Sequence, residues 1–144
     1  GDEASLASYR DDIRNAGIQN ITATGYVPSH QIPMYQAAAD VLIAPNTDQN
    51  KLSAEFTSPL KLFEYMATRR PIVASSLGSI REILTHERTA ILVEPGSASA
   101  LASGISRAFE ETDLAKLISD NALAEVSSNT WHQRAADILV ETGW

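Results

Sequence analysis

Residues 58–75 read SPLKLFEYMATRRPIVAS, and they carry first the signals of a helix and then those of a buried strand. Ser58 suits the cap of a helix and Pro59 its first position, so we expect a helix from here to about Thr68. The residues of this helix expected to face the core are Leu62, Phe63 and Met66. Residues 71–75 are almost wholly apolar, which is typical of a strand covered on both faces. A helix that leads into such a strand indicates an α/β fold.

The same alternation of strand and helix patterns extends outward in both directions. Residues 41–44 and 90–94 suit buried strands, and residues 21–27 read as a further short strand. The expected helices cover residues 32–39, 58–68, 78–84 and the chain from Ser97 onward, with breaks near Thr112 and Ser127. We therefore predict four strands, each followed by a helix. This order predicts an α/β fold with a doubly wound, mostly parallel sheet and helices on both faces.

The chain opens on a helix pattern rather than on a strand. Leu6, Tyr9 and Ile13 share one stripe of this helix, and Gly17 suits its end. An α/β unit normally begins with a strand, so we expect residues 1–144 to be a single domain of a larger chain that lacks its first strands. The alternative is a helix packed on the sheet edge with nothing lost. An open parallel edge exposes unpaired backbone groups, so we expect the isolated chain to self-associate.

Composition narrows the class of protein. The 144 residues fit one domain, and 44% hydrophobic residues are enough for a packed core. The net charge of −7 argues against nucleic-acid binding. No apolar run approaches the ~20 residues of a transmembrane helix. We therefore expect a cytoplasmic protein with no transmembrane segment, which can lie at a membrane surface through a domain outside this chain.

Several common binding and catalytic motifs are missing from the sequence. The 7 glycines do not fall into the spacing of dinucleotide-binding or P-loop motifs. The 3 histidines lie far apart and cysteine is absent, so we expect no metal site, disulfide or thiol nucleophile. No G-x-S-x-G motif supports a serine hydrolase. The chemistry must therefore come from other residues.

The most concentrated chemistry lies at the start of the helix that begins at Ser58. Parallel sheets bind ligands at the carboxyl ends of their strands, and this helix follows the strand at 41–44. Its free backbone N–H groups favour an anion, to which Lys61 adds a positive charge. Glu64, about one turn further on the same face, is placed to accept hydrogen bonds from a ribose diol. The alternative is an ordinary surface ion pair between Lys61 and Glu64.

These segments resemble the donor-binding, C-terminal half of GT-B glycosyltransferases, and family 4 in particular. The resemblance covers nearly the whole chain and is most specific from Ser58 to Ser75. Its other segments are Gly25 to Pro28, Tyr35 to Pro45, Ile80 to Leu84, Leu92 to Gly96 and Thr130-Trp131. It implies that a sugar is transferred from a nucleotide-diphosphate sugar with retained anomeric configuration, without a cofactor or a required metal. It also implies that an N-terminal domain of the same parent chain binds the acceptor, so that the isolated chain is inactive.

The resemblance also implies roles for individual residues. Glu64 matches the second carboxylate of the family's E-x7-E pattern, which binds the donor ribose. The other residues matched to the donor site are Gly25, Tyr26 and Val27 beside the nucleobase, and Ser58, Pro59, Leu60 and Lys61 around the diphosphate. In that second group, the backbone N–H groups of Leu60 and Lys61 meet the diphosphate. Gly78, after the strand at 71–75, is a further candidate for a contact with the donor sugar or the acceptor.

One position departs from the family pattern. The first carboxylate of E-x7-E would fall on Phe56, and the nearest acid, Glu55, is one residue away. Either the loop shifts so that Glu55 contacts the donor sugar, or the chain lacks that contact. Phe56 is also the main support for an alternative function, a non-catalytic nucleotide-sugar-binding or interaction module of the same fold.

Overall fold

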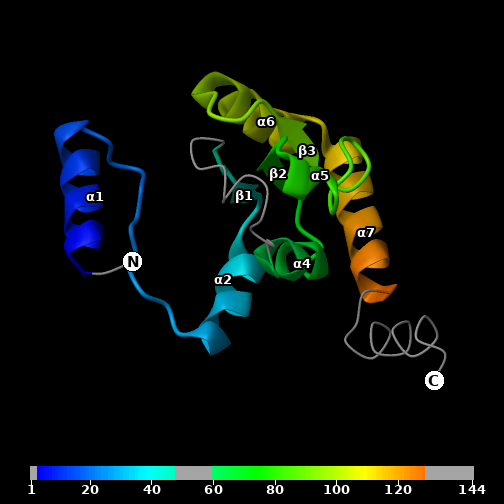
Figure 1. Ribbon diagram of the computed structural model, residues 1–144, viewed down its shortest axis with the longest axis horizontal. Coiled ribbons are helices and arrows are strands. Elements are labelled where there is room, and N and C mark those ends of the chain that lie inside the picture. Colours follow the sequence, from blue (N-terminus) through cyan, green and yellow to red (C-terminus); the bar gives the residue numbers. More distant parts are fainter. Residues whose placement is uncertain (1–2, 48–59, 129–144) are drawn as a thin grey trace. The chain divides into compact units, whose positions relative to one another are not determined.

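The computed structural model describes residues 3–47 and 60–128, which fall into two compact units, residues 1–35 and 36–144 (Figure 1). The second unit contains a parallel sheet of three strands, β1 (Leu42–Ala44), β2 (Ile72–Ser75) and β3 (Ile91–Val93), in the order β1-β2-β3. The strands at 41–44, 71–75 and 90–94 and the parallel sheet are therefore confirmed.

Helices cover both faces of this sheet. The helices that follow β1 and β2 are α4 (Leu60–Ala67) and α5 (Gly78–Arg81), and those that follow β3 are α6 (Ala98–Glu110) and α7 (Thr112–Ser128). In Figure 1, α4 and α6 lie on opposite sides of the sheet, and α7 packs against both. The doubly wound arrangement is thus present in the second unit.

The core consists of two apolar clusters, one on each face of the sheet. All four residues of the central strand β2 are buried, as the apolar run at 71–75 predicts. Ile72 and Ala74 belong to the cluster that contains Leu62 and Met66 of α4. Val73 points to the other face, where it packs with residues of α6 and α7. Residues that alternate along one strand therefore join α4 to one face and α6 to the other.

Helix α6 carries a glycine where it packs against the sheet, and the contact leaves no room for a side chain there. A Cβ atom at Gly104 would lie 2.7 Å from Val93 Cγ1 and 2.9 Å from Val73 Cγ1. The helix begins after Ser97, whose hydroxyl accepts a hydrogen bond from the backbone N–H of Ala100. Its cap at Ser97 and its end before Thr112 agree with the sequence prediction.

The first unit corrects one of the predicted strands. It contains α1 (Glu3–Asn15) and a short 3₁₀ helix, η1 (Ser29–Gln31), whereas residues 21–27 form no strand. The physical reason is that a strand needs a partner along its edge, and the described residues supply none here. Instead, the Arg10 guanidinium donates to the carbonyl of Ala23 (2.7 Å). The prediction of four strands is therefore wrong: the described residues form three.

Two helix predictions need adjustment. The helix expected over 32–39 is α2 (Ile32–Ala38), and the short helix η1 leads into it. The helix expected over 78–84 ends at Arg81, although Leu84 is still buried in the core. No helix within residues 3–47 and 60–128 combines the length and the apolar character needed to cross a membrane.

Candidate functional site

Helix α4 carries the predicted site on its exposed face. It follows β1 in the chain, so it begins beyond the carboxyl end of a parallel strand, where such sheets bind ligands. Lys61 and Glu64 are exposed, whereas Leu62 and Met66 are buried. Phe63, the third residue predicted to face the core, is partly buried and packs against the same cluster. The predicted division of this helix into a polar face and a core face is confirmed. The remaining residues predicted nearby lie outside the described residues: Glu55, Phe56, Ser58 and Pro59.

The carboxylate of Glu64 is held by a buried amide. Gln36 Nε2 donates a hydrogen bond of 3.2 Å to Glu64 Oε2, and Gln36 itself is only 9% exposed. The neighbouring Tyr65 is affected by the Glu64 charge as well. Burial first, and the negative charge of Glu64 second, raise the pKa of the Tyr65 hydroxyl above its ordinary value of 10.0. The phenol of Tyr65 therefore stays neutral beside a carboxylate that has one oxygen engaged by an amide donor.

Lys61 contacts a different partner. Its Nζ lies 3.3 Å from Asn46 Oδ1, and Asn46 follows β1 closely in the chain. Among the ion pairs between described residues, none joins Lys61 to Glu64. The ordinary surface pair considered from the sequence is therefore not formed. The ammonium and carboxylate groups remain one helical turn apart on the same face, each with its own neutral partner.

The last turn of α2 is tied to the segment that follows α4. Arg70 Nη2 donates to the carbonyl oxygen of Ala37 at 2.6 Å. This bond joins the backbone next to Gln36 to the turn between α4 and β2. Gln36 was missed by sequence reasoning, yet a signal for it exists. It follows Ile32 at i+4 and precedes Ala39 at i+3, so a polar residue interrupts the inward stripe of the predicted helix.

The residues matched to the nucleobase loop belong to the first unit. Gly25 has a φ of 78°, which favours glycine, and a Cβ atom there would lie 2.8 Å from Leu6 Cδ2. Tyr26 is 87% exposed, and Val27 is partly buried. These residues are placed within the first unit, whereas Glu64 belongs to the second.

Gly78 lies where the sequence places it, at the first position of α5 after β2. The loop before it is held by Arg81, whose Nη1 donates to the Ser76 carbonyl at 3.0 Å. A Cβ atom at Gly78 would meet no atom within 4 Å. The fold therefore leaves open space at this position, and packing alone does not require a glycine there.

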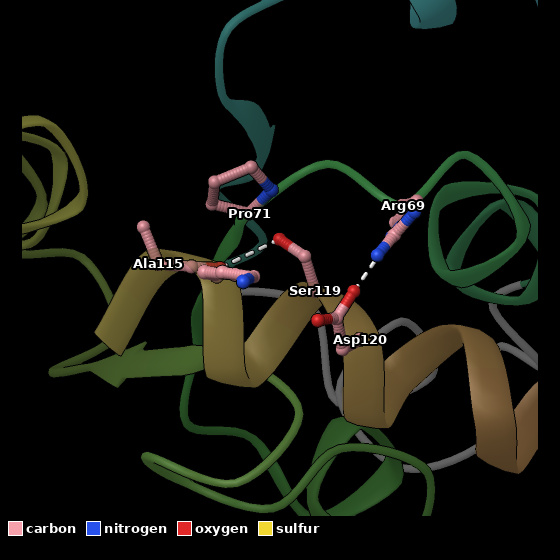
Figure 2. Close-up of a pocket in the computed structure, with 6 residues that line it drawn as sticks. Arg69, Pro71, Ala115, Ser119 and Asp120 are labelled. Carbon is pink, nitrogen blue, oxygen red and sulfur yellow. Dashed lines mark hydrogen bonds and ion pairs between the residues drawn. The ribbon is translucent and has the colours of Figure 1, made fainter. Parts of the chain in front are cut away.

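A shallow hollow of about 330 Å³ lies elsewhere, at the opposite end of β2 (Figure 2). Its lining residues are Arg69, Pro71, Ala115, Lys116, Ser119 and Asp120. Arg69 Nε contacts Asp120 Oδ1 at 2.6 Å across it, and this hydrogen bond lowers the pKa of the Asp120 carboxyl. Because Pro71 precedes β2, the hollow lies away from the strand ends at which α4 begins. It joins the α4–β2 turn to α7 and contains none of the predicted site residues.

Among the described residues, histidine, aspartate and glutamate side chains do not gather in groups of three or more that can hold a metal ion.

Comparison with known proteins identifies the family. The model of the family described as "Glycosyl transferases group 1" matches residues 1–111. The provisionally named teichuronic acid biosynthesis glycosyltransferase TuaC of Bacillus subtilis (strain 168) is 28% identical over 119 residues, which are 83% of this chain and 24% of TuaC. The 2-deoxystreptamine N-acetyl-D-glucosaminyltransferase of Niallia circulans is 26% identical over 129 residues, 89% of this chain and 31% of that protein.

A solved structure extends the likeness to the fold. Anabaena Alr3699/HepE in complex with UDP-glucose superposes with a TM-score of 0.77 and 25% identity, over 98% of this chain and 38% of that one. The chain thus spans about a third or less of the length of the curated relatives described above. Its parallel sheet and helices match the Rossmann-like half of GT-B glycosyltransferases. The chain therefore belongs to the group 1 glycosyltransferases.

Proposed function

We propose that the protein transfers a sugar from a nucleoside diphosphate sugar to an acceptor with retained anomeric configuration, as a family 4-like enzyme, and that this chain forms its donor-binding half. An N-terminal domain of the same polypeptide would bind the acceptor. The proposal includes no cofactor and no required metal, and it places the enzyme in the cytoplasm. The observation that carries it is the Glu64 carboxylate on the exposed face of α4, one turn from Lys61.

The spacing on α4 suits a nucleoside diphosphate. Leu60 and Lys61 are the first two described residues of α4. Backbone N–H groups at the start of a helix can bind an anion, which the helix dipole also favours. Glu64 lies three residues further, a rise of about 4.5 Å along the helix axis. A diphosphate at the first turn therefore brings the hydroxyls of its ribose near a carboxylate that can accept two hydrogen bonds.

Known relatives suggest which nucleotide to test first. HepE has been crystallised with UDP-glucose, with UDP, and with UDP and glucose together. In our proposal, Gly25, Tyr26 and Val27 lie beside the base, Ser58 and Pro59 begin the diphosphate-binding turn, and Gly78 approaches the sugar or the acceptor. Glu55 is proposed as the donor-sugar contact in place of the missing first carboxylate.

A non-catalytic nucleotide-sugar-binding module is the second candidate, and Phe56 in the first carboxylate position favours it. Calorimetric titration of the full-length protein with UDP, GDP and ADP measures whether and which diphosphate binds. Incubation with the corresponding labelled nucleotide sugars then separates the two candidates. Release or transfer of the sugar supports the enzyme, and binding without turnover supports the module. Absence of binding by all three diphosphates contradicts both.

A further inference from the structure

The hydrogen bond between Gln36 and Glu64 is an interaction that the fold creates at the proposed ribose site. The Gln36 side chain is buried, and its Nε2 donates to Glu64 Oε2 at 3.2 Å. The two residues are 28 positions apart in the chain, on α2 and α4. A glutamate on a helix surface otherwise samples several rotamers, because each of its side-chain torsions has staggered minima. The amide restricts Glu64 to rotamers that keep Oε2 in reach.

The amide group of Gln36 is chemically suited to orienting a carboxylate. An amide is neutral, so it orients the carboxylate without cancelling the negative charge that attracts hydroxyl donors. A lysine or arginine in its place would form an ion pair and compete with the ribose for the same oxygens. Gln36 engages Oε2, and among the described residues no hydrogen bond or ion pair engages Oε1, whose lone pairs can therefore accept from hydroxyl groups.

The position of Gln36 is itself secured by backbone contacts. Arg70 donates to the carbonyl of Ala37 at 2.6 Å, and the carbonyl of Gln36 accepts from the N–H of Ala39 at 3.3 Å. The end of α2 is therefore attached to the turn that leads from α4 into the buried strand β2. Because α4 packs on the core through Leu62 and Met66, both partners of the amide–carboxylate bond stand on fixed backbone.

We propose that Gln36 is a positioning residue, which orients the Glu64 carboxylate toward the ribose diol of the donor before the nucleotide arrives. This inference rests on the proposed function, in which Glu64 binds the ribose. Fixing one flexible side chain in advance is worth about three- to tenfold in affinity. The benefit exists only for ligands that carry the ribose hydroxyls.

The test uses the full-length protein and two probes, UDP and 2′,3′-dideoxyuridine diphosphate, titrated by calorimetry. Gln36→Met keeps a buried side chain of similar length and removes the N–H group that donates to Glu64. It should weaken the affinity for UDP by about three- to tenfold and leave the affinity for the dideoxy analogue unchanged. In the Glu64→Ala background, adding Gln36→Met should weaken UDP no further. Gln36→Glu, which sets a second carboxylate against Glu64, provides a second variant if the methionine protein fails to fold, with the same selective loss expected at pH 8.

Asn121→Ala is the matched control. Asn121 Nδ2 donates to the carbonyl of Arg88 at 2.9 Å, so this variant also loses one amide hydrogen bond, and its UDP affinity should match the wild type. Equal weakening of UDP and the dideoxy analogue by Gln36→Met, or no weakening where Glu64→Ala has a clear effect, overturns the positioning role alone. Normal UDP affinity of Glu64→Ala overturns the ribose role of Glu64, and the inference about Gln36 with it.

Discussion

Replacing Glu64 by glutamine removes the negative charge from the exposed face of α4 while keeping the length of the side chain. The amide oxygen of the new residue can still accept from Gln36 Nε2, now at 3.2 Å from Glu64 Oε2, so the local packing should survive. What is lost is the charge on the oxygen that we expect to accept from the ribose hydroxyls. Hydrogen bonds to a charged group contribute about 1.5–3 kcal/mol.

The structure places the expected effect at the lower end of that range. Glu64 is exposed, so solvent screens its interaction with the ligand. A loss of about 1.5 kcal/mol corresponds to roughly a tenfold weaker nucleotide affinity. The assay is titration of the full-length Glu64→Gln protein with the diphosphate that binds the wild type, compared with Glu110→Gln, an exposed glutamate on α6. Thermal unfolding checks that both variants fold.

Two results would refute this reasoning. Affinity within a factor of about two of the wild type would mean that the charge of Glu64 does not reach the ligand. An equal loss for the ribonucleotide and its 2′,3′-dideoxy analogue would mean that Glu64 acts on some other part of the nucleotide.

Three further predictions concern the charge at the first turn, the sheet edge and pH. Lys61→Ala should weaken a diphosphate more than a monophosphate and a nucleoside least, since only the diphosphate extends to the helix start; equal losses in calorimetric titration would leave Lys61 as a partner of Asn46 alone. The second of these concerns the outer edge of β1. The N–H of Leu42 donates to the carbonyl of Pro71, next to β2, so the N–H and C=O groups of the following residue, Ile43, point away from β2. The Ile43 side chain is 37% exposed. The isolated 144-residue chain should therefore self-associate at this edge, and a monodisperse monomer in light scattering would contradict this. Asp120 has a pKa held below its ordinary 3.8 by the hydrogen bond from Arg69, so its ion pair stabilises the fold above that value and ceases to do so as the pH falls through the lowered pKa. In urea unfolding, the stability lost in Asp120→Asn should shrink between pH 7 and pH 2.5; a difference that is the same at both pH values would exclude this pair as its source.

Most of the second unit could be predicted from local sequence patterns. The apolar runs at 41–44, 71–75 and 90–94 correspond to β1, β2 and β3, and Ser97 caps the start of α6. A strand that is buried on both faces appears in the sequence as a short run of consecutive apolar residues. Such a run can be recognised without knowing what the strand packs against. The run at 21–27 carries a similar signal but no partner strand, and there Arg10 bonds the carbonyl of Ala23 instead. A strand forms only by hydrogen bonding to a neighbouring strand, so an apolar pattern alone is not enough to predict one.

On the polar face of α4, too, the sequence predicts the exposed residues but not their partners. Helical periodicity placed Lys61 and Glu64 on one exposed face, one turn apart, and the buried positions of Leu62 and Met66 agree with it. Their partners, however, lie 15 and 28 residues away in the chain, at Asn46 and Gln36. Periodicity is set by the backbone geometry of a single helix and can be read along the chain. Which side chain meets a carboxylate depends on how α2, β1 and α4 pack together, and that packing exists only in the folded protein.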